Sequence, residues 1–222
     1  MSRRARHNSI KTLVLLASLL GALQLAPAAL GATQEDKTQF SVSAGSLSFS
    51  TVPAMPTLSS VTLKAEAQTT SSAMTNFGVA DATGSGSGWN VTVAGQSGTK
   101  KSAVFAQYCA KALCGSEAEG YVAGGATLPA NSLTLNSTGA SLAAQGGSSG
   151  TAPTLQCSAS CNVDSASAVK IVSAAEKAGM GTFLTSGWSG TSLALATPST
   201  LKLLPNEEVY RVNLLWTLST GP

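Results

Sequence analysis

The chain has 222 residues, of which 43% are hydrophobic and 10% charged, and its ordered apolar patterns argue for one folded domain against a disordered chain. Four of the 13 basic residues and the only histidine, His7, lie in the first 32 residues, so the remainder carries 9 basic against 10 acidic residues. This near-neutral remainder has no basic patch for nucleic acid. The lack of histidine also excludes Ser-His-Asp and Cys-His catalysis and every histidine-containing metal site.

Residues 1–32 are predicted to be a secretory signal peptide that is cleaved near Gly31 or Ala32. Basic residues at positions 3, 4, 6 and 11 come first, an apolar run over residues 13–25 follows, and small residues complete the segment. The apolar run is shorter than the roughly 20 residues of a membrane span. We therefore expect a secreted, extracellular protein with a single domain over residues 33–222 and no stable membrane insertion after cleavage.

Alternation of apolar and polar residues predicts short strands along the rest of the chain. The alternation recurs at Leu47 and Phe49, at Trp89, Val91 and Val93, at Leu133 and Leu135, at Leu193 and Leu195, and at Leu201 and Leu203. Residues 169–172 are apolar on both faces apart from one lysine, which indicates a more central strand. Clusters of Gly and Ser over residues 82–88 and 143–153 predict surface loops. The pattern is typical of an all-β fold, a β-sandwich of roughly 8 to 12 short strands.

One stretch departs from this alternation. Residues 102–115 are rich in alanine, and Phe105, Tyr108, Cys109 and Leu113 recur at helical spacing before a glycine. This pattern predicts a short helix or helical turn.

The most regular apolar stretch lies at the end of the chain. Alternation places Tyr210, Val212, Leu214, Trp216 and Leu218 on one face. The segment is therefore predicted to be one long strand that is paired within a sheet and buries its tryptophan.

The four cysteines form two close pairs, Cys109 with Cys114 and Cys157 with Cys161. After a signal peptide, an even number of cysteines predicts two disulfides, and sequence alone allows three connectivities. We favour local pairing within each close pair. A four-thiolate zinc site is the alternative, and an oxidising compartment opposes it.

The carboxylates offer little for catalysis. Glu207 and Glu208 are adjacent, so in an extended chain their side chains point to opposite faces and cannot flank one substrate bond. Glu117 and Glu119 lie in a stretch flanked by glycine, and Asp81 precedes a glycine-rich loop whose backbone it can orient. We predict no catalytic residue, no metal site and no cofactor, and hence a protein that is not an enzyme.

Three tryptophans in a secreted β protein suggest glycan binding, because exposed aromatic rings stack on sugars. Trp89 and Trp216 alternate in register with aliphatic neighbours, which favours positions in the core. Trp188 lies between a glycine and a serine, and it is the one expected to be exposed.

Two tryptophan-containing stretches resemble the motifs of WxL-domain cell-surface proteins. The ending LLWTLSTGP is similar to the distal Trp-x-Leu motif, and FGVADATGSGSGWNVTV is similar to the proximal motif, in which an aspartate precedes a glycine-rich turn and a Gly-Trp strand. LSFSTVPAM and VKIVSAAEKAGMGTF extend the resemblance over nearly the whole mature chain. The chain departs from the family pattern at Val91, where leucine is expected, and in residues 102–162, which look like a disulfide-bearing insertion.

The resemblance implies a protein secreted by a Gram-positive bacterium and held non-covalently at the cell wall through peptidoglycan or another wall polymer. It implies that wall association depends on six motif residues with three supporting ones. These are Trp89, Asn90, Val91, Trp216, Thr217 and Leu218, supported by Asp81, Gly88 and Tyr210. The segment LLPNEE begins like a sortase signal but has glutamate at two key positions, so we expect no covalent anchor.

Two other functions compete with wall binding. The protein could instead be an adhesin or structural subunit that binds other surface proteins by strand pairing at a sheet edge, with the tryptophan motifs serving only the fold. A secreted hydrolase with a carboxylate pair is the third hypothesis. The positions of the carboxylates in the sequence oppose it.

Overall fold

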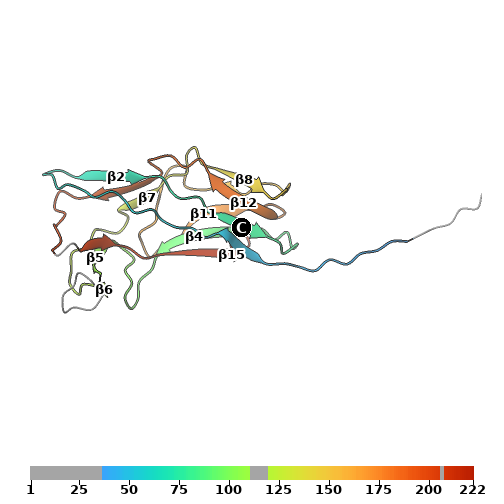
Figure 1. Ribbon diagram of the computed structural model, residues 1–222, viewed down its shortest axis with the longest axis horizontal. Coiled ribbons are helices and arrows are strands. Elements are labelled where there is room, and N and C mark those ends of the chain that lie inside the picture. The colour runs from blue at the N-terminus through green and yellow to red at the C-terminus, as the bar shows by residue number, and fades with distance from the viewer. Residues whose placement is uncertain (1–36, 111–119, 206–207) are drawn as a thin grey trace, which may run out of the picture. The chain divides into compact units, whose positions relative to one another are not determined.

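The apolar and polar alternation of the sequence becomes a set of antiparallel sheets in the computed structural model, which describes residues 37–110, 120–205 and 208–222 (Figure 1). Ser43–Pro222 form one compact unit. The predicted signal peptide lies outside the described residues, so its cleavage stays a prediction. The described residues contain fifteen strands and no helix, which confirms the all-β class and exceeds the expected number of strands, because several strands have only two or three residues.

The strands form three four-stranded sheets and one three-stranded sheet among the described residues. Sheet A has the order β1 (Leu47–Thr51), β3 (Gly78–Asp81), β12 (Gly181–Ser186) and β8 (Ser141–Gln145). Sheet B has the order β10 (Cys161–Asn162), β7 (Leu133–Leu135), β13 (Leu193–Thr197) and β2 (Gln68–Ser72). Sheet C has the order β15 (Leu214–Thr220), β4 (Trp89–Gly95), β11 (Val169–Ala174) and β9 (Thr154–Leu155). The three-stranded sheet has the order β14 (Val209–Arg211), β5 (Ala106–Cys109) and β6 (Gly120–Tyr121).

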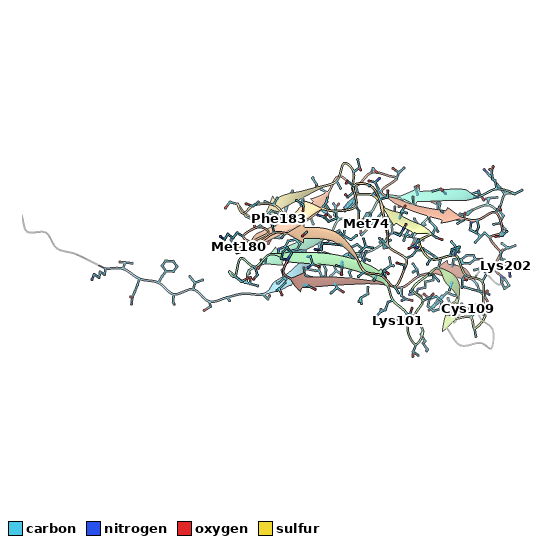
Figure 2. The ribbon with its side chains drawn as sticks, turned by 180° about the vertical axis from the view of Figure 1, so that it is seen from behind. Met74, Lys101, Cys109, Met180, Phe183 and Lys202 are labelled. Carbon is cyan, nitrogen blue, oxygen red and sulfur yellow. A yellow bond between two sulfur atoms is a disulfide. The ribbon has the colours of Figure 1, made fainter. Side chains whose placement is uncertain are left out.

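One hydrophobic core joins the faces of several sheets. Its fully buried side chains come from β3 and β12 of sheet A, from β7 and β13 of sheet B, and from β4 and β11 of sheet C. Met74 and Phe183, labelled in Figure 2, are 3% and 1% exposed. Sheets that bury one face each against a shared core are the arrangement of a sandwich, as expected from the alternation.

Strand β4 shows the alternation most clearly. Trp89, Val91 and Val93 have no exposed surface, whereas Asn90 and Thr92 between them are half-buried. The expected central strand is also confirmed, because β11 lies between β4 and β9.

The expected helix over residues 102–115 is wrong where the structure describes it. Residues Ala106–Cys109 form β5, which pairs with β14 and β6. The helical spacing of the apolar residues is overridden because pairing with two strands satisfies the backbone groups and because Tyr108 packs edge-on against Tyr121, with 5.2 Å between ring centroids. Residues 111–115 lie outside the described part of the chain.

The predicted long C-terminal strand is divided in two. β14 and β15 belong to different sheets, and Val212 and Asn213 separate them. The side chain of Asn213 accepts a hydrogen bond from the Tyr121 hydroxyl at 2.5 Å, and its backbone N–H donates to Ser102 O at 2.8 Å. These non-local bonds replace the strand ladder at this point, and sequence alternation does not reveal them.

The strand expected around Leu201 and Leu203 is also absent. Residues 201–204 have no regular structure, and Leu203 is 85% exposed. Pro198 and Pro205 flank this segment, and proline cannot donate a backbone hydrogen bond to a sheet.

The local disulfide between Cys157 and Cys161 is confirmed, with an S–S distance of 2.09 Å. Both thiols are therefore unavailable to zinc, and the four-thiolate alternative is wrong. Cys114 lies outside the described residues, so its pairing with Cys109 stays a prediction.

Residues 102–162, the predicted insertion, contribute strands to all four sheets. Strands β7 and β10 join sheet B, β8 joins sheet A and β9 joins sheet C. Strands β5 and β6 form the three-stranded sheet with β14, so of this segment only β9 lies in the same sheet as the tryptophan motifs. That the segment is an insertion stays a prediction.

Candidate functional site

The two tryptophan motifs, far apart in sequence, lie on adjacent strands of sheet C (Figure 1). β4 and β15 pair antiparallel over seven residues, with Trp216 opposite Val93, Thr217 opposite Thr92 and Leu218 opposite Val91. Residues that are directly opposite in a sheet share a face. The two motifs thus form one continuous surface on each side of the sheet.

Trp89 is held inside the core by a specific pocket. Its indole Nε1 donates a hydrogen bond of 3.0 Å to Gly179 O, and its side chain has no exposed surface. Gly179 has φ +74°, and a Cβ there would lie 2.5 Å from Trp89 Nε1 and 2.5 Å from Ala174 Cβ. Glycine at this position is therefore required both by the backbone conformation and by the close approach of the indole.

Hydrogen bonds join Gly221 to the proximal motif. Gly221 N–H donates to Gly88 O at 2.9 Å, and the Asn90 side-chain amide donates to Gly221 O at 2.8 Å. Gly88 itself has φ +72°, and a Cβ there would lie 2.4 Å from Ala174 O. The backbone of Gly88 therefore approaches β11 closely, and its predicted support of wall association stays a prediction.

Trp216 has a different environment from Trp89. It is half-buried on the edge strand β15, and its ring centroid lies 5.5 Å from that of Phe77 in a tilted arrangement. Trp188 also packs on Phe77, with 6.4 Å between ring centroids, and its Nε1 donates to Thr185 Oγ1 at 3.2 Å. The expectation of an exposed Trp188 is wrong, because Phe77 covers one face of the ring and leaves it half-buried.

The outward face of the paired motifs is polar. Asn90 and Thr92 of β4 are half-buried, and Thr217 and Ser219 of β15 are exposed. Because Thr217 is opposite Thr92 and Ser219 is opposite Asn90, these four side chains form a compact group of hydroxyls and one amide. We call these four residues the polar motif face.

Asp81 has the turn-forming role that the sequence allowed. It lies at the end of β3, is 6% exposed, and its Oδ1 accepts hydrogen bonds from Thr83 N at 3.0 Å and Thr83 Oγ1 at 2.7 Å. These bonds shape the start of the glycine-rich loop that leads to Trp89.

Tyr210, the third supporting residue, lies away from this loop. It belongs to β14, opposite Gln107 of β5, and its hydroxyl donates to Lys202 O at 2.9 Å. Burial raises the pKa of Tyr210 above its usual value.

Of the other carboxylates considered, Glu208 accepts a hydrogen bond from the Gln107 amide, while Glu117, Glu119 and Glu207 lie outside the described residues. Over residues 37–110, 120–205 and 208–222, no group of three His, Cys, Asp or Glu side chains is close enough to hold a metal ion.

Sequence reasoning missed Asp164, a fully buried carboxylate. Its Oδ1 accepts a hydrogen bond from Leu133 N at 2.9 Å and its Oδ2 accepts one from Ser132 N at 3.0 Å. Burial raises the pKa of Asp164, and these backbone hydrogen bonds oppose the rise. Both oxygens are engaged by the start of β7, so the side chain has a structural role, and nothing in its sequence context marks it.

The described part of the chain contains no helix long and apolar enough to cross a membrane. The fold and the site define an all-β domain in which the two tryptophan-containing strands, β4 and β15, pair with each other, and Gly221 after β15 is hydrogen-bonded to Gly88 before β4.

A family model for the WxL domain, described as surface cell wall-binding, matches residues 31–222. The chain therefore belongs to the WxL-domain family, which confirms the resemblance seen in its motifs. This is a cell-wall-binding family and not a family of enzymes. No curated protein and no solved structure matches the chain.

Proposed function

We propose that this WxL-domain protein is secreted by a Gram-positive bacterium and binds peptidoglycan non-covalently through the polar motif face. Membership of a cell-wall-binding family supports wall association in general. The polymer and the contact residues are the proposal. The observation that carries it is the register of β4 and β15, which brings the outward residues of both motifs together.

The chemistry of this face suits a glycan with peptide stems. The hydroxyls of Thr92, Thr217 and Ser219 donate and accept hydrogen bonds, as sugar hydroxyls and peptide groups do. Two successive outward pairs, Thr217 with Thr92 and Ser219 with Asn90, are polar, and the exposed Leu215 opposite Ala94 lies next to them on the same face. A repeating polymer can bind such a surface through many weak contacts.

The tryptophans then act on the site indirectly. Trp89 is fully buried and hydrogen-bonded, so it cannot stack on a sugar in this structure. It anchors β4, and β4 in turn positions Asn90 and Thr92 on the opposite face. Loss of wall binding on substitution of Trp89 is therefore expected to follow from loss of the fold.

The test is a pull-down with isolated peptidoglycan sacculi, using the purified secreted protein. The Thr92→Ala/Thr217→Ala double variant removes two adjacent hydroxyls from the polar motif face. We expect its pelleted fraction to fall several-fold, while its free energy of unfolding changes by less than about 0.5 kcal/mol per site because these positions are not in the core.

A matched control is available on another sheet. Thr69 and Ser71 are exposed hydroxyl residues of β2, opposite Ala196 and Ala194. The Thr69→Ala/Ser71→Ala variant is expected to pellet like the wild type. Equal pelleting of both double variants, or failure of the wild type to pellet, would contradict the proposal.

The alternative function, binding to other proteins with the tryptophans serving only the fold, is favoured by one separate observation. Residues 38–44 carry two large apolar side chains that are almost fully exposed.

A further inference from the structure

Residues 38–44, with the sequence TQFSVSA, have the residue pattern of a strand but are not assigned to one. The segment has no regular structure. Phe40 is 88% exposed and Val42 is 82% exposed, and polar residues alternate with them. Period-two alternation of this kind is typical of a strand that buries one face.

The compact unit Ser43–Pro222 also contains an apolar groove of about 970 Å³. Its lining includes Leu58, Leu128, Leu195, Tyr210 and Trp216, and Lys202, labelled in Figure 2, marks its position. Ligand pockets in proteins are usually about 300 to 1,000 Å³, so this groove is at the upper end of that range. It is large enough for several apolar side chains.

Two edge strands contribute residues to the groove. Thr70 of β2 and Trp216 of β15 both contribute to its lining, and these strands are the outermost members of sheets B and C. In the part of the chain that the structure describes, neither strand is hydrogen-bonded to a second strand on its outer side. Backbone groups on such an edge can pair with an added strand.

An irregular segment forms one wall of the groove. Residues 52–63 have no regular structure, and their backbone N–H and C=O groups form no backbone ladder with the described residues. Two side chains bond to this wall, since Thr70 Oγ1 donates to Ser59 O at 3.5 Å and Thr75 Oγ1 donates to Ala54 O. Met55 and Leu58 pack against the core, so the wall is fixed mainly by apolar contacts.

We propose that residues 38–44 of one copy add as a strand to the apolar groove of a second copy, with Phe40 and Val42 buried in it. The donated segment carries no charge, so its burial leaves no unpaired ion. The contact joins two different surfaces and is therefore heterologous, which generates rings or linear chains of copies. This assembly does not depend on the polar motif face.

The first experiment is sedimentation velocity of the purified secreted protein over a hundredfold concentration range. The wild type is expected to form larger species as the concentration rises. The Phe40→Ser/Val42→Ser variant is expected to remain monomeric throughout, and the Gln39→Ala/Ser41→Ala control, which changes the other face of the segment, is expected to assemble like the wild type.

A wild type that stays monomeric at every concentration would overturn the proposal. So would a Phe40→Ser/Val42→Ser variant that assembles as the wild type does. These substitutions lie at exposed positions outside the core, so changes in assembly do not arise from unfolding. The same variant is expected to pellet normally with sacculi, which separates failure of this proposal from failure of wall binding.

The second experiment locates the contact. p-Benzoylphenylalanine is incorporated at position 40 and activated in a mixture of isotopically light and heavy protein. Crosslinks between light and heavy copies to groove residues such as Leu58, Leu195 or Trp216 are expected. Crosslinks confined to single chains, or to surfaces remote from the groove, would overturn the proposal.

Discussion

Trp89 and Trp216 belong to the same pair of motifs, yet the structure gives them different positions. Trp89 lies on β4, which has a neighbour on each side, and it is fully buried and hydrogen-bonded. Trp216 lies on the edge strand β15 and is half-buried against Phe77. A shared motif therefore does not imply a shared role. The first tryptophan stabilises the core, and the second lies between the core and an open groove.

The largest effect is expected for Trp89→Ala. Truncation of a fully buried aromatic side chain costs about 3 to 5 kcal/mol, which is a large part of the roughly 5 to 15 kcal/mol that stabilises a typical domain. Urea unfolding measured by far-UV circular dichroism checks this value. A loss below about 1 kcal/mol, well under the range for buried aromatic truncations, would remove the distinction between the two tryptophans.

The next effect tests the pocket around Trp89. Gly179→Ala places a methyl group 2.5 Å from Trp89 Nε1 in a residue with positive φ. Backbone strain of about 1 to 2 kcal/mol and overpacking of about 1 to 3 kcal/mol are expected to add. Gly139→Ala is the matched control, because Gly139 has φ +84° and a Cβ added there would have no atom within 4 Å. Equal destabilisation of both variants would show that contact with the indole is unimportant.

Trp216→Ala is expected to destabilise less than Trp89→Ala, by about 0.5 to 3 kcal/mol, because the side chain is already partly hydrated in the native state. Thermal melts of the two variants side by side give the comparison. If the melting temperature of Trp216→Ala falls as far as that of Trp89→Ala, the position of Trp216 on an edge strand does not reduce the cost of removing its side chain.

The smallest expected effect is a pH dependence of stability that arises from Asp164, which is fully buried as Trp89 is. Asp164 adjoins Ser165, whose carbonyl accepts a hydrogen bond from Gly95 N at the end of β4. Burial raises the folded-state pKa of Asp164 above the usual value of about 3.9. Between the unfolded-state pKa and the higher folded-state pKa of Asp164, the folded protein binds more protons than the unfolded protein. The contribution of Asp164 to stability therefore falls as the pH rises through that window.

The difference in unfolding free energy between wild type and Asp164→Asn, measured by urea titration from about pH 3 to about pH 7, checks this sign. The wild type is expected to lose stability relative to the variant as the pH rises through the window. If the wild type instead gains stability relative to the variant as the pH rises, the hydrogen bonds from Ser132 and Leu133 outweigh the effect of burial on the pKa.

Much of the local structure could be predicted because burial repeats with period two. Residues 89 to 93 alternate without exception, and the strands around Leu47, Leu133 and Leu193 lie where the alternation places them. The strand at Val169 lies where a run that is apolar on both faces predicts it. The predictions failed where a distant partner decides the outcome. Residues Ala106–Cys109 have helical spacing but form a strand, because β14 and β6 satisfy their backbone.

The candidate site shows the same division. The residues of both motifs could be named from their resemblance to a family, and alternation placed Trp89 in the core, as the structure confirms, but the half-burial of Trp216 could not be predicted. That Trp89 is inaccessible follows from the closeness of Gly179, and that Thr92 and Thr217 are adjacent follows from the register of β4 and β15. Neither relation has a local signal, since 90 residues separate Trp89 from Gly179.

By itself the sequence determined the all-β class, the strand faces and the family, because side-chain alternation and motif identity are local properties. Tertiary structure alone decided that Trp188 and Trp216 are half-buried, where the last strand divides and which hydroxyls share a face. The physical reason is that these properties depend on which backbone edges pair. Pairing between distant strands is set by the packing of the whole core and not by the residues beside each motif.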